Sequence, residues 1–169
     1  MSITMFEGQE NTPNPQGQLA TVHGKRLEDR VEATLRKYGV NFVDYKDFTY
    51  GKEPTCVKNA PHTTPYGGKG YHEFELWNVV PGRVRIECRS QYVPGSADEK
   101  LPYLFESVLI GKENVAWIIF DGDGFKTGAK ETIRKKAESV THKKIKTFTS
   151  FKQWESWISV VLGNQPRLG

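Results

Sequence analysis

The sequence predicts an α/β protein in which a central mixed β-sheet is flanked by helices. Two strand-like runs are separated by Pro81-Gly82, a strong turn signal, and predict an antiparallel hairpin. Residues 114–120 form a nearly continuous apolar run, which is typical of a strand buried on both faces. Helical patterns alternate with the strands, so we expect a parallel closing strand–helix–strand unit and helices that cover the sheet.

Length and composition predict one globular domain. The chain has 169 residues, of which 37% are hydrophobic, and this is enough for a single core. Residues 1–20 are rich in Asn, Gln, Pro, Gly and Thr and predict a flexible leader, so the domain is expected to span 21–169. No run approaches the roughly 20 apolar residues of a membrane span, and the start of the chain lacks the features of a signal peptide. We therefore expect a soluble, intracellular protein without a membrane partner.

The domain is predicted to begin with an amphipathic helix over about 25–38, which Gly39 would end. Residues 41–48 are predicted to be extended. Residues 51–70 are dense in Pro, Gly and Thr, so we expect a long loop, a kind of segment that often carries function. The apolar stripe of the helix is Leu27, Val31, Leu35 and Tyr38.

The hairpin and the helix after it occupy the middle of the chain. The strands are predicted over 71–80 and 83–93. Ser96 is the predicted N-cap of the next helix, with Glu99 completing a capping box. Because Pro102 lies beyond the first turn, we expect this helix to start later or to bend.

The C-terminal part alternates strands and helices. The strand at 114–120 is followed by a turn at 121–125, a helix over about 127–140, a short strand at 144–150 and a last helix over 150–162. The inward stripe of the last helix is Phe151, Trp154, Ile158 and Val161.

The second hairpin strand carries the most informative pattern in the sequence. Apolar residues alternate with charged residues, so one face of the strand is apolar and the other is polar. Glu87 and Arg89 are two residues apart and therefore lie on the same side. Glu73 or Glu75 supplies a second carboxylate from the partner strand. The polar positions are Arg85, Glu87, Arg89 and Gln91.

This constellation suits a metal-dependent phosphodiesterase. Cleavage of a phosphodiester needs hard oxygen ligands for Mg²⁺, an activated water and a cation near the charge that develops on phosphorus. The alternative is that acids and bases on an exposed strand face form cross-strand ion pairs. A strict two-residue turn at Pro81-Gly82 would place Glu73 on the face opposite Glu87, whereas a longer loop or a bulge would bring them to one face.

Four short motifs carry a resemblance to a known family: Glu73-Phe74, Ile86-Glu87-Cys88-Arg89-Ser90-Gln91, the block from Gly95 to Tyr103, and the block from Phe120 to Phe125. From Gly24 to about Trp157 the chain resembles the PD-(D/E)XK (restriction-endonuclease-like) nuclease superfamily, in particular a branch of small phage, restriction and homing-type endonucleases. The resemblance implies a restriction-endonuclease-like core of the αβββαβ type. It also implies a Mg²⁺-dependent endodeoxyribonuclease that accepts Mn²⁺, leaves 5′-phosphate and 3′-hydroxyl ends, and acts in the cytoplasm of a bacterial or phage-infected cell.

Carried over residue by residue, the resemblance makes Glu73 and Glu87 the metal carboxylates. Glu28 or Glu32 on the first helix matches the acid that many members direct at the metal, although both also suit surface salt bridges. Glu75 has the same strand parity as Glu73 and stays a candidate ligand. The first acid is Glu where the family usually has Asp, so this ligand is one methylene longer.

Arg89 occupies the position of the family's lysine, and Gln91 flanks the site. An arginine stays charged and can hold phosphate or stabilise the transition state, but it does not readily act as a general base. Activation of water would then rest on the metal or on Lys100 reaching in from the next helix. The alternative for Lys100 is a solvated lysine in the first helical turn.

DNA contacts are expected from the 51–70 loop and from a basic stretch over 130–146, which together would hold the DNA backbone. The alternative for the basic stretch is a solvated helix face followed by a polar turn. The candidate DNA-binding residues are Lys69, His72, Lys130, Arg134, Lys143 and Lys144.

The sequence therefore predicts a metal-dependent DNA endonuclease. Cutting both strands needs two sites, so a homodimer or a higher symmetric oligomer is a candidate assembly. One alternative is a catalytically inactive nuclease fold that serves as a DNA-binding or protein-interaction module, because Glu73 and Arg89 depart from the family pattern. Another alternative is a nuclease with the same core that acts on RNA or on branched junctions.

Overall fold

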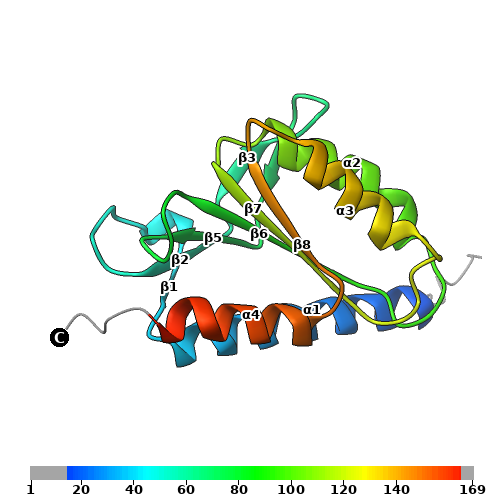
Figure 1. The fold of residues 1–169 in the computed structure, drawn as a ribbon, viewed down its shortest axis with the longest axis horizontal. Helices are drawn as coiled ribbons and strands as arrows, with labels where there is room; N and C mark the ends of the chain where they lie inside the picture. The colour runs from blue at the N-terminus through cyan, green and yellow to red at the C-terminus, as the bar shows by residue number, and fades with distance from the viewer. Residues whose placement is uncertain (1–14, 165–169) are drawn as a thin grey trace, which may run out of the picture.

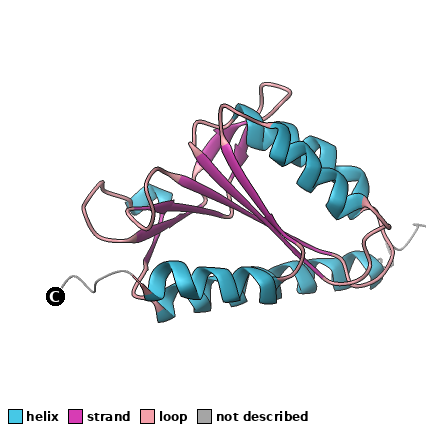
Figure 2. Ribbon diagram, in the orientation of Figure 1, coloured by secondary structure: helices cyan, strands magenta, loops and turns pink. Residues whose placement is uncertain are grey.

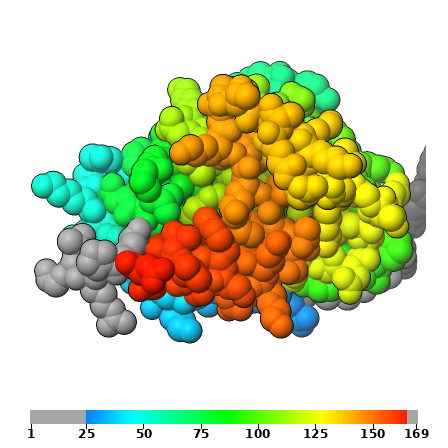
Figure 3. Space-filling model, viewed as in Figure 1, coloured from blue at the N-terminus to red at the C-terminus, as the bar shows by residue number. Residues whose placement is uncertain are grey.

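The computed structural model describes residues 15–164, with side chains from residue 25 onward. A central sheet lies between two helix pairs (Figure 1 and Figure 2). One face is covered by α1 (Pro15–Lys37) and α4 (Phe151–Gly163), and the other by α2 (Ala97–Ile110) and α3 (Ala129–Ser139). The helices α3 and α4 form much of the molecular face seen in Figure 3. None of the helices described is long and apolar enough to cross a membrane.

Two sheets account for the strands in the described part of the chain. The strands are β1 (Asn41–Asp44), β2 (Thr55–Lys58), β3 (Pro61–Thr63), β4 (Lys69–Tyr71), β5 (Phe74–Trp77), β6 (Val84–Ser90), β7 (Val115–Asp121) and β8 (Lys144–Phe148). The larger sheet has the order β1-β2-β5-β6-β7-β8, and β3 pairs with β4 alone. In the larger sheet β5 is antiparallel to both neighbours, and the other pairs are parallel. The predicted α/β fold with a mixed sheet between helices is confirmed.

Alternation along the strands divides the core into two clusters. Ile86 and Cys88 of β6 face α1 and α4, where they pack in one cluster with Trp154. Ile118 and Phe120 of β7 pack in the other cluster, beneath α2 and α3. Because helices cover both faces of β7, its sequence is apolar almost throughout, as predicted.

Two segments differ from the sequence prediction. α1 begins at Pro15, so residues 15–20 of the expected leader are helical, and residues 1–14 lie outside the described part of the chain. The expected long loop over 51–70 contains the strands β2, β3 and β4. Each of these strands has only three or four residues. Such strands are too short to show a clear alternation among prolines and glycines.

The connection between β5 and β6 decides which carboxylates meet. Residues 78–83 join the two strands, in place of the predicted two-residue turn. Phe74 pairs with Ile86, a register that places Glu73 opposite Glu87. The longer connection thus brings both carboxylates to the same face of the sheet.

The start of α2 is fixed from outside the helix. Ser96 is the N-cap as predicted, but its hydroxyl makes no capping hydrogen bond within the described part of the chain. The Ala97 backbone N–H instead donates to Gln91 Oε1 at 2.8 Å. Pro102 lies inside the helix. Contact with the end of β6 therefore replaces the predicted capping box.

The turn that follows β7 packs directly on the end of β6. A Cβ at Gly122 would lie 2.5 Å from the backbone oxygen of Gln91, and one at Gly124 would lie 2.4 Å from that of Val93. Any larger residue would push the two segments apart. The glycines thus allow the close approach that forms one wall of the site.

The packing of α4 yields a stability prediction. Trp154 is fully buried in the cluster beneath α1 and α4. We expect Trp154→Ala to lower the free energy of unfolding by about 3–5 kcal/mol, because it leaves a large cavity. The control Val160→Ala changes an exposed residue of the same helix and should shift it by less than about 0.5 kcal/mol. Urea unfolding measures both. Equal losses in the two variants would contradict this account of the core.

Candidate active site

A cleft of about 950 Å³ opens between the polar face of β6, the start of α2 and the β3–β4 pair. The alternation of β6 explains its chemistry. Side chains that do not face the α1–α4 core project toward α2 and into the cleft. The structure brings all five predicted catalytic residues to this cleft: Glu73, Glu87, Arg89, Gln91 and Lys100.

Arg89 bridges the two carboxylates of the cleft. Its Nη1 donates to Glu73 Oε1 at 2.7 Å, and its Nη2 donates to Glu87 Oε2 at 2.8 Å. The second oxygen of Glu73 accepts a hydrogen bond from the backbone N–H of Cys88 at 2.7 Å. Glu87 is only 3% exposed, so protein groups rather than water must balance its charge.

Arg85 holds the second oxygen of Glu87. This buried arginine donates from Nε to Glu87 Oε1 at 2.6 Å. Its two terminal nitrogens donate to Ser107 on α2, one to the backbone oxygen at 2.9 Å and one to Oγ at 3.0 Å. Because the guanidinium is planar and fully engaged, it fixes the position of Glu87 relative to α2.

Two carboxyl groups at the site, those of Glu73 and Glu28, have raised pKa values. Burial raises the pKa of Glu73 to about 7, with Arg89 acting to lower it and Glu87 to raise it further. Burial also raises the pKa of Glu28 on α1, a residue that senses the charges of Arg89 and Glu87. An added cation favours the charged form of such carboxyl groups. Carboxylate oxygens are the ligands that Mg²⁺ prefers, so the residues fit a divalent ion, although each carboxylate now gives one oxygen to Arg89.

Two other predicted residues take different places. Lys100 is exposed at the rim of the cleft. Gln91 is buried, and its Nε2 donates to the backbone oxygen of Gly124 at 2.7 Å while its Oε1 holds the start of α2. The amide of Gln91 therefore joins α2 to the turn after β7.

Glu32 on α1 forms ion pairs with Arg36 and Lys58. It thus takes the surface salt-bridge role that was the predicted alternative to metal binding.

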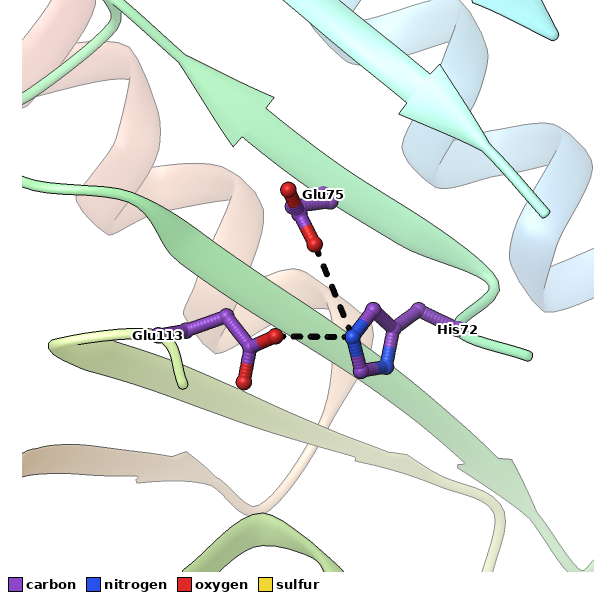
Figure 4. Close-up of side chains that lie close together, drawn as sticks. All are labelled: His72, Glu75 and Glu113. Carbon is purple, nitrogen blue, oxygen red and sulfur yellow. Dashed lines mark hydrogen bonds and ion pairs between the residues drawn. The ribbon is translucent and has the colours of Figure 1, made fainter. Parts of the chain in front are cut away.

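His72, Glu75 and Glu113 form a second titratable group. Both carboxylates are directed at Nε2 of His72, Glu113 at 2.8 Å and Glu75 at 3.5 Å (Figure 4). All three are buried with donor atoms within 4.8 Å of one another, and no other such trio occurs among the described residues. Arg83 pairs with both carboxylates, at 3.4 Å from Glu75 and 3.7 Å from Glu113. Glu75 thus belongs to this group, which corrects its candidacy as a ligand beside Glu73 and Glu87.

Two predicted DNA-binding residues are buried, and this corrects the prediction for both. His72 lies in the group with Glu113. Lys143 donates from Nζ to the backbone oxygens of Val108 and Gly111. Desolvation of both side chains is compensated inside the protein, and neither side chain is at the surface where a nucleic acid would bind.

The basic stretch over 130–146 does not line the cleft. Lys130 donates to two backbone oxygens, and Arg134 pairs with two glutamates of its own helix. Lys69 and Lys144 are exposed. Lys69, Lys144 and the ion-paired side chain of Arg134, which is 41% exposed, therefore remain accessible from solvent.

Sequence reasoning missed three residues that hold the site. Arg85 gave a usable signal, because it shares its strand parity with Glu87 and Arg89. Ser107 and Glu113 gave none, since they come from α2 and the segment after it and meet the sheet only through tertiary packing.

The pairing of Glu113 yields a pH prediction. Burial raises the pKa of Glu113, but the hydrogen bond with His72, a backbone hydrogen bond and the nearby charge of Arg85 together outweigh it and hold the pKa at about 2, below the ordinary 4.5. Because the folded protein binds this proton less readily, the carboxylate adds stability above pH 4.5 that is lost as the pH falls toward 2.

We expect Glu113→Gln to lower the free energy of unfolding by on the order of 2 kcal/mol at pH 7. The difference from the unmodified protein should shrink between pH 4.5 and pH 2. Chemical unfolding at a series of pH values measures this, with Glu106→Gln on the exposed side of α2 as control. A difference that does not vary with pH would rule out the charge of Glu113 as its cause.

Comparison with known proteins places the chain in a family. A family model described as a PD-(D/E)XK nuclease superfamily domain matches residues 19–158. No curated protein and no solved structure is significantly similar to the chain. The matched range begins on α1 and ends on α4, so it contains the cleft with Glu73, Glu87 and Arg89. Nucleases of this superfamily generally use divalent metal ions. The chain therefore belongs to the PD-(D/E)XK nuclease superfamily.

Proposed function

We propose that this protein is a Mg²⁺-dependent DNA endonuclease that hydrolyses phosphodiester bonds in the cleft beside β6. The observation that carries the proposal is that Glu73 and Glu87 face each other across β5 and β6 with Arg89 between them. Two carboxylates and a cation on one sheet face are the groups that metal-assisted phosphodiester hydrolysis uses. Membership of the superfamily supports a nuclease-type function.

Each residue of the cleft has a role in this proposal. Glu73 and Glu87 would hold Mg²⁺ or Mn²⁺, with Glu28 on α1 as a further candidate ligand. When bound, the ion supplies an activated water and neutralises charge on the phosphate. Arg89 stays protonated, so it would bind a phosphate oxygen and stabilise the negative charge of the transition state. Lys100 at the rim would contact the DNA backbone.

Arg85 would act as a positioning residue. It is only 2% exposed, and its hydrogen bonds go to Glu87 and Ser107, so it would act on the substrate through Glu87, whose orientation it sets against α2. Because Arg85 holds Oε1 of Glu87, the other oxygen, Oε2, stays directed at the cleft.

A catalytically inactive nuclease fold, serving as a DNA-binding or protein-interaction module, is the second candidate. It is favoured by one observation: Arg89 already takes an oxygen from each carboxylate. For the nuclease and for the DNA-binding module we expect DNA as the partner, and in either case the cytoplasm of a bacterial or phage-infected cell as the location. Cleavage of both strands would require two copies, in a homodimer or a higher symmetric oligomer.

Removal of Glu87 tests the proposed activity. We expect the protein to cleave supercoiled plasmid and long linear DNA in Mg²⁺ or Mn²⁺ but not in EDTA. Glu87→Ala should reduce the rate by about 100-fold or more, because it removes a direct ligand of the ion. Glu131→Ala, an exposed change on α3 away from the cleft, should leave the rate unchanged. Gel analysis of time courses gives the rates. Binding without cleavage of any substrate in either metal would favour the inactive module.

Replacement of Arg89 by lysine tests whether the guanidinium competes with the ion. A lysine has one ammonium nitrogen and a flexible stem in place of the planar fork whose two nitrogens each contact one carboxylate, so it should hold Glu73 and Glu87 together less firmly than Arg89 does. We therefore expect Arg89→Lys to bind Mn²⁺ several-fold more tightly in calorimetric titration. Arg36→Lys is the matched control, because Arg36 also contacts a glutamate through two nitrogens but lies on the surface of α1. Weaker binding by Arg89→Lys would show that Arg89 supports the ion instead of competing with it.

A further inference from the structure

Exposed tyrosine rings gather at the rim of the cleft. Tyr71 and Tyr103 line it, and Tyr66 packs on Tyr103 with ring centroids 5.3 Å apart. Tyr66 is 88% exposed and Tyr103 is 40% exposed. Exposed apolar surface that clusters beside a candidate site indicates a binding role, whereas single exposed rings need no explanation. We call Tyr66, Tyr71 and Tyr103 the tyrosine rim.

The rim is presented by built structure. Tyr66 lies in the tight turn between β3 and β4, which is closed by hydrogen bonds between Thr64 and Gly68 and between Gly67 and Thr64. Gly67 has a φ of 80°, a conformation that favours glycine. The turn and the contact with Tyr103 on α2 therefore hold an exposed ring in a defined place. The ring has only two rotatable side-chain bonds, so little entropy remains to be lost on binding.

Cations accompany the rings. Lys69 Nζ lies 5.3 Å from the centroid of the Tyr71 ring, and Lys100 lines the cleft beside Tyr103. Glu99 is also at this rim, so the surface is mixed rather than purely basic. Aromatic rings interleaved with lysines are the surface that single-stranded nucleic acids bind, the rings by stacking on bases and the lysines by contact with phosphates.

We propose that the tyrosine rim stacks on unpaired bases, so that the preferred substrate is nucleic acid with a single-stranded segment beside the cut, such as a flap, a branch or a melted end. This inference rests on the proposed nuclease function of the cleft. In a continuous duplex each base already stacks on its neighbours and offers no free face to a tyrosine ring. The cleft volume of about 950 Å³ is at the upper end of the range for small-molecule pockets, so it has room for a nucleotide drawn out of a helix.

Binding measured without metal tests the proposal separately from catalysis. The probes are fluorescent oligothymidylate and a mixed-sequence duplex in EDTA, followed by anisotropy. Stacking contributes about 1–3 kcal/mol per base. We therefore expect Tyr66→Ala and Tyr103→Ala each to weaken oligothymidylate binding by roughly 5- to 150-fold and duplex binding by less than about twofold.

Two further variants make the result specific. Tyr66→Phe keeps the ring and should retain binding, which separates stacking from a hydroxyl contact. Tyr50→Ala removes a 71% exposed ring that packs on Trp77 away from the cleft, and should bind both probes normally. Circular dichroism checks that each variant is folded.

The outcomes decide the proposal. Selective loss on oligothymidylate supports it, and a matching loss on oligouridylate extends it to RNA. No loss, or equal loss on both probes, overturns it. Cleavage of flapped and continuous duplex DNA in Mg²⁺ is measured in parallel. A protein that shows the stacking selectivity but cuts neither substrate would refute the nuclease function while leaving the binding site in place.

Discussion

Neutralisation of the buried charges on β6 is the constraint on which the rest of the structure depends. Arg85 and Glu87 have almost no contact with water, and an unpaired charge in such a place costs several kcal/mol. Arg85 and Glu87 pair with each other, and Ser107 on α2 accepts hydrogen bonds from Arg85. Arg89 on β6 donates to Glu87 and links it to Glu73, which lies just before β5. The charges are balanced only when β5 has the correct register and α2 lies in its place. Well-packed apolar side chains would stabilise this face equally well, so retention of the charges favours a chemical role.

The same face of the sheet supports two acidic groups with opposite behaviour. Glu73 shares one guanidinium with Glu87, and burial raises its pKa to about 7. Glu113 is also buried, yet its hydrogen bond with His72, a backbone hydrogen bond and the nearby charge of Arg85 together hold its pKa at about 2. The first group therefore gains most from an added cation, whereas the second is already balanced by His72 and Arg83. The group around Glu73 is therefore the one suited to chemistry. The group around Glu113 is a structural network that holds β5 against the segment before β7.

The sequence was sufficient for the parts of the fold that repeat a pattern over several residues. The alternation of β6, the apolar run of β7 and the stripe of α4 each correspond to an observed element. They also placed Glu87 and Arg89 on one face, since strand parity needs no tertiary information. The strands within 51–70 were missed because each is too short to show a period. The burial of His72 and Lys143 was missed because segments distant in the sequence cover them. The sequence around a lysine or histidine does not indicate which distant carbonyl or carboxylate it contacts in the folded protein.

The edge strand β8 has a consequence for assembly. Among residues 15–164 it pairs with β7 alone, which places it at the end of the sheet with one side of its backbone unpaired by any described strand. Lys144 and Lys146 are exposed at alternate positions along it. A second sheet that docked against this edge would have to bring its own strand alongside these ammonium groups, and an identical edge would add like charges. The edge thus protects the protein from continuing its sheet into a neighbour. Two copies that cooperate on one DNA are therefore not expected to meet by pairing their β8 edges.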